Sequence, residues 1–188
     1  MTFTIDWTFT HVRLGLRLRW AIWGLALCLG GLNSLHASPV YSDEATQTCV
    51  AQATSDSPSL SGYAVLGCVG LSSQRCMVAP GGDTTVGMID CLQAELGYWD
   101  RRLNAAYARR MAAARSEDAA MSRIRATTAS LADGLRGMQR AWIAYRDAAC
   151  LYEQAQWLGG TGGGPATMAC HLHETARQAL KLEGWWSQ

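Results

Sequence analysis

Two carboxylates, Glu95 and Asp100, lie five positions apart in a stretch of helical character and are candidates for acid–base chemistry. Glycosidases use a pair of carboxyl groups that flank the bond they break. Side chains five residues apart on a helix point about 140° away from each other. These two groups therefore cannot flank one bond by themselves. A hydrolase acting on cell-wall glycan is the least supported function class, since it would require a second carboxylate about 5 to 10 Å from one of them.

Metal binding and nucleophilic catalysis find little support in the sequence. His171 and His173 lie two positions apart, so they do not face the same way on a helix and are not expected to share a metal ion. The cysteine spacings match no zinc pattern, and no Ser-His-Asp motif is visible. The sequence therefore predicts no catalytic residue, no metal site and no cofactor.

The glycine-rich stretch WLGGTGGGPATMAC, residues 157–170, raises the question of phosphate binding. A Walker loop requires GxxxxGK[ST] between a strand and a helix, because backbone N–H groups cradle the phosphates while the lysine neutralises them. No lysine follows here, and the preceding segment is helical. We predict a joint between two helices, with Pro165 as the first residue of the second helix. The loop is also a possible partner-binding element, formed by Gly159, Gly160, Thr161, Gly162, Gly163 and Gly164.

Residues 1–37 have the layout of a secretory signal peptide. A stretch with three arginines precedes an apolar run over 20–32 that is too short to span a bilayer comfortably. We expect cleavage after Ala37 and a periplasmic or secreted protein with no stable membrane anchor; an uncleaved anchor is the alternative. Cys28 lies in the apolar run, but it follows Leu27 rather than the small residue that lipoprotein processing normally uses.

Removal of this leader leaves six cysteines, an even count that indicates a disulfide framework in an exported chain. Helices that fold back on each other across the glycine loop bring Cys150 and Cys170 within bridging range, so we predict a disulfide between them. The pairing of the other four stays open, because sequence alone does not choose among the possibilities. These four are Cys49, Cys68, Cys76 and Cys91.

Apolar residues recur at helical spacing in three segments, whereas strand signals are scarce. The first long helix is expected to be capped by Asp83 or Thr84 and to end near Ala114, before a break at residues 116–118. The apolar positions of the three segments are Ile89, Leu92, Leu96, Trp99, Leu103 and Tyr107, then Leu131, Leu135, Met138, Trp142, Tyr145, Ala149 and Tyr152, then Ala169, Leu172, Ala176 and Leu180. We predict an all-α fold, a small disulfide-stapled bundle of about three long helices preceded by short N-terminal helices.

The chain is expected to consist of two parts after the leader. Residues 38–83 form a cysteine-containing extension packed on the core, and residues 84–186 form the helical domain. The extension is expected to be loosely structured up to residue 62, apart from a turn or short helix around Cys49. A short helix then runs from about Gly62 to Val78 and ends before Pro80.

Three runs resemble the lysozyme inhibitor LprI-like family of bacterial exported proteins. They are CLQAELGYWDRRLNAAY (residues 91–107), MQRAWIAYRDAAC (138–150) and ACHLHETARQALKLE (169–183), the last preceded by the glycine loop. The resemblance covers roughly residues 88–183, and QRAWIAYRDAAC is its most specific part. It implies a small helical envelope domain that inhibits lysozyme.

A polar network is expected among the matching residues. Arg146 lies near the apolar stripe of its helix, and we predict an ion pair with Glu95 or Asp100 that fixes the register of two helices. Asn104 and Tyr107 are expected to join this network, which also includes Asp147. Trp99 and Trp142 are expected to be core residues rather than ligand platforms.

Charge is distributed unevenly along the chain. Residues 38–100 carry seven carboxylates against one cation, Arg75, whereas the remainder is predominantly basic. An acidic region suits a cationic protein partner such as a lysozyme, although the two halves also neutralise each other within one fold. The function expected is a protein-binding module, not an enzyme or a nucleic-acid binder, that inhibits a lysozyme or another cell-wall hydrolase. The alternative is an envelope structural or interaction protein that has the same scaffold and no inhibitory activity.

Overall fold

The computed structural model describes residues 40–56, 61–124 and 129–184, and these residues form helices, turns and no strands. The helices in chain order are α1 (Glu44–Asp56), α2 (Ser61–Leu66), α3 (Leu71–Met77), α4 (Thr85–Met121), α5 (Leu131–Ala155) and α6 (Gly163–Glu183). The all-α prediction is therefore confirmed. The expected signal peptide and Cys28 lie outside the described residues.

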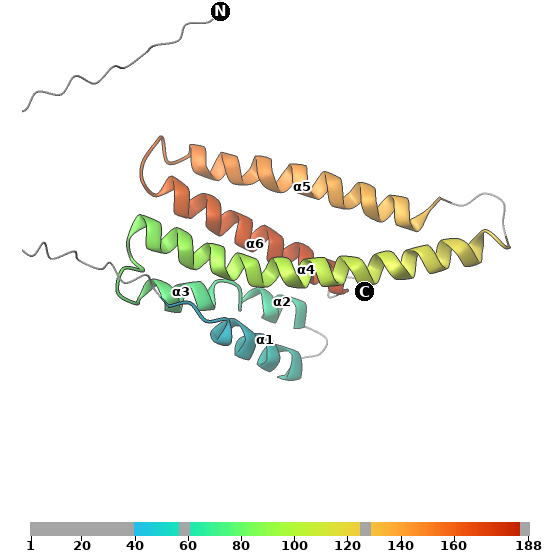
Figure 1. Cartoon of the computed structure of the whole chain (residues 1–188), viewed down its shortest axis with the longest axis horizontal. Coiled ribbons are helices and arrows are strands. Elements are labelled where there is room, and N and C mark those ends of the chain that lie inside the picture. Colours follow the sequence, from blue (N-terminus) through green and yellow to red (C-terminus); the bar gives the residue numbers. More distant parts are fainter. Residues whose placement is uncertain (1–39, 57–60, 125–128, 185–188) are drawn as a thin grey trace, which may run out of the picture. The chain divides into compact units, whose positions relative to one another are not determined.

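The long helices form one layer and the short helices another (Figure 1). α6 packs against both α4 and α5, α3 packs on α4, and α1 contacts α2 and α3. The apolar stripes of α4 and α6 meet in the core, where Trp99, Leu103, Leu172 and Leu180 are buried. The helical spacing of these residues therefore identified the faces that pack.

Helix α5 covers the core less completely than its apolar periodicity suggests. Only Ala132 and Cys150 are buried on it, whereas Tyr145 and Tyr152 are exposed. The expectation that these two tyrosines lie in the core was wrong. A helix at the edge of a small bundle buries a narrow face, because it has a neighbour on one side only.

The start of α4 agrees with the sequence and its end does not. The Thr84 hydroxyl accepts a hydrogen bond from the Gly87 N–H at 3.0 Å and caps the helix. The helix continues to Met121, beyond the break expected at residues 116–118. The segment after Gly97 contains neither glycine nor proline and is rich in alanine, the residue with the highest helix propensity.

The N-terminal extension contains more helix, and more breaks, than expected. α1 extends over 13 residues, and the single helix expected from Gly62 to Val78 is divided into α2 and α3. The division coincides with Gly70, whose φ of 96° lies in the left-handed region that favours glycine. Pro165 is the third residue of α6 rather than the first, a position that still lies in the first turn, where a missing N–H is tolerated.

A carboxylate cap joins the last turn of α4 to the first turn of α5. Asp118 accepts hydrogen bonds from the N–H groups of Leu131 at 2.8 Å and Ala132 at 3.1 Å, and from the Ser130 hydroxyl at 2.8 Å. Below this cap, Met111 packs against Ala132 in a small apolar cluster. Asp118, which was expected at a break in α4, thus holds the start of α5.

We expect stability to depend on pH through Asp118. The N–H groups of Ala132 and Leu131 and the Ser130 hydroxyl lower the pKa of this carboxyl. Its contribution is present above the ordinary pKa of an aspartate and is lost as the pH falls through the lower folded-state pKa. Asp118→Asn should therefore reduce the melting temperature at pH 7, and the difference from the parent protein should disappear in acid. Thermal unfolding followed by circular dichroism measures this, with the exposed neighbour variant Glu117→Gln as control. A difference that persists undiminished in acid would contradict the cap.

Candidate functional site

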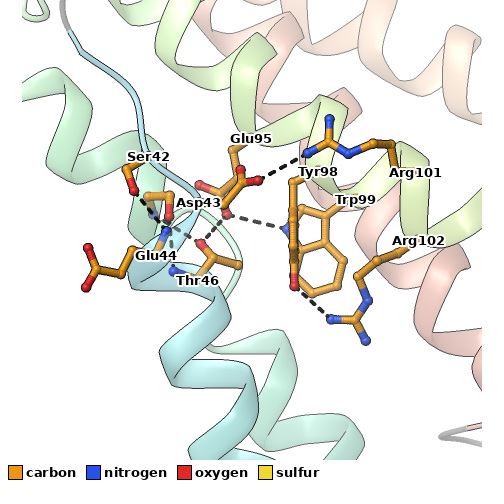
Figure 2. Close-up of polar contacts among 10 residues, drawn as sticks. Ser42, Asp43, Glu44, Thr46, Glu95, Tyr98, Trp99, Arg101 and Arg102 are labelled. Atoms are coloured by element: carbon orange, nitrogen blue, oxygen red, sulfur yellow. Dashed lines mark hydrogen bonds and ion pairs between the residues drawn. The ribbon is translucent and has the colours of Figure 1, made fainter.

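A buried carboxylate joins α4 to the N-terminal extension (Figure 2). Glu95 is fully buried, and its two oxygens accept hydrogen bonds from the Gly70 N–H at 2.8 Å and the Ser73 N–H at 2.7 Å. The Thr46 hydroxyl of α1 donates to Glu95 at 2.8 Å, and the Trp99 indole N–H lies 3.4 Å from the same oxygen. Three helices are therefore held together at one charged group, which is fully supplied with donors.

Ion pairs flank this group on the surface of α4. Arg101 contacts Asp43 at 3.1 Å, as Figure 2 also shows. Arg102 contacts Glu183 at 2.6 Å and lies 4.8 Å above the Trp99 ring. Burial opposes the charge of Arg102, but the hydrogen bonds and charge of Glu183 outweigh it, so the pKa of Arg102 is raised. These contacts have structural roles in docking α1 and α6 onto α4.

The predicted polar network is divided into separate groups. Arg146 donates from Nε at 2.9 Å and from Nη2 at 2.7 Å to Asp147 Oδ1, rather than to Glu95 or Asp100. Its guanidinium lies 4.9 Å from the centroid of the Trp142 ring. The expected ion pair is not formed because backbone N–H groups already satisfy Glu95, while Asp147 is adjacent to Arg146 in the chain.

The remaining members of that network make local contacts. Asp100 accepts a hydrogen bond from the Asn104 side-chain amide at 2.9 Å, one turn further along α4. Tyr107 packs against both apolar clusters. Asp100 and Arg146 nevertheless line the same shallow hollow between α4, α5 and α6. Asp100 is the one carboxylate among the described residues of that lining, so the carboxyl pair of a glycosidase is not assembled there.

The glycine loop between α5 and α6 is clasped at its base. A disulfide joins Cys150 to Cys170, the pair that the sequence predicted. The Trp157 carbonyl accepts a hydrogen bond from the Gly160 N–H at 2.8 Å, and a Cβ atom at Gly162 would clash with the Trp157 ring. The loop is thus a tight turn that an aromatic ring covers.

Two apolar residues at the start of this loop were missed by the sequence reasoning. Leu158 is 94% exposed and has a positive φ of 49°, and Trp157 is 51% exposed. Large apolar residues directly before a glycine run are the signal that would have identified them. Gly163 and Gly164, in contrast, belong to α6, where a Cβ on Gly164 would lie 2.9 Å from Ile89 of α4. The glycines at this end of the run permit close helix packing.

The other two disulfides tie the extension together and to the long helices. Cys49 of α1 pairs with Cys68 in the turn before α3, and Cys76 of α3 pairs with Cys91 of α4. The described residues contain no group of three His, Cys, Asp or Glu side chains that could hold a metal ion. Among the helices described, none has the length and apolar character needed to cross a membrane.

Comparison with known proteins identifies the family. A family model described as lysozyme inhibitor LprI matches residues 76–182. The chain is 32% identical over 139 residues to an uncharacterized 17.7 kDa protein in the puhA 5' region of Rhodobacter capsulatus, a match that covers 73% of this chain and 82% of that protein. No solved structure matches. The chain therefore belongs to the LprI lysozyme inhibitor family, as its motifs suggested.

Proposed function

We propose that this protein is a periplasmic or secreted binding module that inhibits a lysozyme or a related cell-wall hydrolase, and that it has no enzymatic activity of its own. The observation that carries the proposal is the clasped loop, which presents Leu158 and Trp157 to solvent. Membership of an inhibitor family adds to it. The proposed role of the loop is to place an apolar tip in a cleft of the target.

The loop has two properties that favour binding. The Cys150–Cys170 disulfide and the packing of Trp157 on Gly162 order the loop before it meets a partner. A preorganised loop loses less conformational entropy on binding than a mobile one. Exposed aromatic and aliphatic side chains at such a tip are typical anchors of protein interfaces.

Two exposed acidic residues near the start of α4 suggest the charge of the target. Because a Cβ on Gly164 would lie 2.9 Å from Ile89, the start of α4 is adjacent to the first turn of α6, which follows the loop. Asp83 and Asp90 are exposed in this part of the chain. Lysozymes of the animal type are cationic, so exposed carboxylates near the start of α4 would complement them and increase the association rate.

The disulfides support export as the second part of the proposal. Three bridges staple the described residues, and disulfides persist mainly in oxidising compartments such as the periplasm. Residues 1–37 have the sequence layout of a secretory signal peptide, which also supports export. Cleavage after Ala37 would leave the mature protein without that apolar segment.

The test is a titration of the oxidised protein into lysozymes of several types while lysis of a peptidoglycan suspension is followed. We expect a saturable loss of lysis that weakens as salt is raised. Leu158→Asp should increase the concentration for half-inhibition by at least about tenfold, since an anchor residue contributes about 1.4 kcal/mol or more. Aspartate tolerates a positive φ, so this change should leave the fold intact.

Leu151→Asp is the matched control, because Leu151 is 65% exposed on α5 and lies outside the loop. An equal loss with both variants would contradict the loop as the binding element. The absence of inhibition by the parent protein at large excess, for every lysozyme type, would overturn the inhibitor proposal. It would leave the alternative, an envelope interaction protein with the same scaffold.

A further inference from the structure

A hollow of about 480 Å³ lies between α4, α5 and α6, apart from the clasped loop. Its polar lining is formed by Gln93 and Asp100 of α4, Arg146 of α5 and His171 of α6, and Leu96 and Met168 are its apolar side chains. A volume of this size accommodates a small molecule or the end of a peptide. The hollow combines one cation, one anion and an apolar surface.

The two charged groups of the hollow do not pair with each other. Arg146 donates hydrogen bonds from Nε and Nη2 to Asp147. Its Nη1 donates no hydrogen bond to any described residue. Asp100 Oδ2 accepts the hydrogen bond from the Asn104 amide, and no described residue donates a hydrogen bond to Oδ1. Opposite charges that line one cavity, each with an unused hydrogen-bonding atom, are suited to a ligand that carries both charges.

The cationic side of the hollow is rigid before any ligand arrives. The Arg146 guanidinium is held between the Trp142 ring at 4.9 Å and Asp147 at 2.7 Å, and its side chain is only 22% exposed. Beside it, burial and the charge of Arg146 lower the pKa of His171, which favours the neutral imidazole, a group that both donates and accepts a hydrogen bond. A site with fixed donors binds its ligand at a smaller entropic cost.

We infer that this hollow binds a zwitterionic amino-acid group, with the carboxylate at Arg146 and the ammonium at Asp100. The aliphatic part of the ligand lies against Leu96 and Met168. Two sources have this chemistry, a free amino acid and a peptide in which one residue carries a free amino-acid group at the end of its side chain. The inference does not rest on the proposed inhibition, since none of the lining residues belongs to the clasped loop.

Gly97 keeps the hollow open. It is part of the lining, and a Cβ there would meet only the Arg101 side chain, at 3.6 Å. Packing therefore does not require glycine at this position. Glycine within a helix also destabilises it by up to about 1 kcal/mol relative to alanine. Gly97→Leu is consequently a variant that fills the hollow and favours the helix. Gly134→Leu on α5 is its matched control, because a Cβ at Gly134 meets nothing within 4 Å and this residue is not part of the lining.

The experiment follows the His171 ring signals by NMR while the oxidised protein is titrated with alanine. N-acetylalanine, which has only the carboxylate, and alaninamide, which has only the ammonium, are titrated in parallel. We expect alanine to bind at least about tenfold more tightly than either. Gly97→Leu should abolish the shifts, Gly134→Leu should retain them, and Asp100→Asn should remove the preference for alanine over N-acetylalanine. A tripeptide that ends in meso-diaminopimelate, whose side-chain end is zwitterionic, distinguishes the peptide source from the free amino acid.

Two results would overturn the inference. One is the absence of His171 shifts with both alanine and the tripeptide at tens of millimolar. The other is equal binding of alanine and N-acetylalanine with no effect of Asp100→Asn, since the hollow would then recognise a carboxylate alone. Circular dichroism and thermal unfolding of each variant establish that it is folded, and Leu158→Asp should bind alanine normally.

Discussion

Glu95→Ala is expected to lower the free energy of unfolding by about 3 kcal/mol or more, one of the two largest effects among single sites in this protein. The substitution removes a buried acceptor and leaves the N–H groups of Gly70 and Ser73 without a partner. The Thr46 hydroxyl loses its acceptor on Glu95 at the same time. Each unsatisfied buried donor costs about 1 to 3 kcal/mol.

Urea unfolding of the oxidised protein, monitored by circular dichroism, measures this effect. Gln93→Ala is the control, because Gln93 lies on the same helix but is exposed. Glu95→Gln keeps the shape of the side chain and one accepting oxygen, so it should be less harmful than Glu95→Ala. A loss below about 0.5 kcal/mol for Glu95→Ala, similar to that of a surface substitution, would show that the carboxylate does not hold the extension to α4.

Removal of the Cys150–Cys170 disulfide by a double substitution to alanine should also lower the free energy of unfolding by about 3 kcal/mol. The bridge closes a segment with a sequence separation of 20 residues, and a crosslink of this span restricts the unfolded chain by about that amount. Alanine is preferable to serine because Cys150 is fully buried and a hydroxyl there would need a partner. The inhibition proposed above should weaken as well, because the loop loses its base.

The Cys49–Cys68 bridge provides the comparison, because its sequence separation of 19 is nearly the same. Its removal should destabilise the protein by a similar amount and leave the strength of inhibition unchanged, provided that the experiment is performed at a temperature where both variants are folded. Equal effects of the two double variants on inhibition would contradict a specific role for the clasped loop. A difference confined to the loop bridge would support it.

The parts of the fold that follow from local sequence patterns were predictable. The spacing of Leu92, Trp99 and Leu103 identified the buried face of α4, and its start was expected at Asp83 or Thr84, of which Thr84 is the cap. The disulfide of the glycine loop followed from an antiparallel turn with one cysteine in each flanking helix. Each of these conclusions depends on interactions between residues that are close in the sequence or on a repeating pattern.

Side-chain contacts made to backbone N–H groups were not predictable from the sequence. Glu95 is satisfied mainly by N–H groups at Gly70 and Ser73, and every residue type other than proline offers such a group, so the sequence carries no mark of the pairing. The partner expected for Glu95 was an oppositely charged side chain, Arg146. The exposed Leu158 was missed because the possible binding loop was defined by its glycines and Thr161 alone.

The order of the three disulfides bears on how the protein matures. Each bridge joins cysteines that follow one another among the six of the described residues, with sequence separations of 19, 15 and 20 residues. A chain that enters an oxidising compartment from its N-terminus presents these cysteines two at a time, so the first bond that each pair can form is also the native one. Because wrong bonds must be broken by slow thiol–disulfide exchange, this arrangement would allow oxidation to keep pace with the entry of such a chain into that compartment.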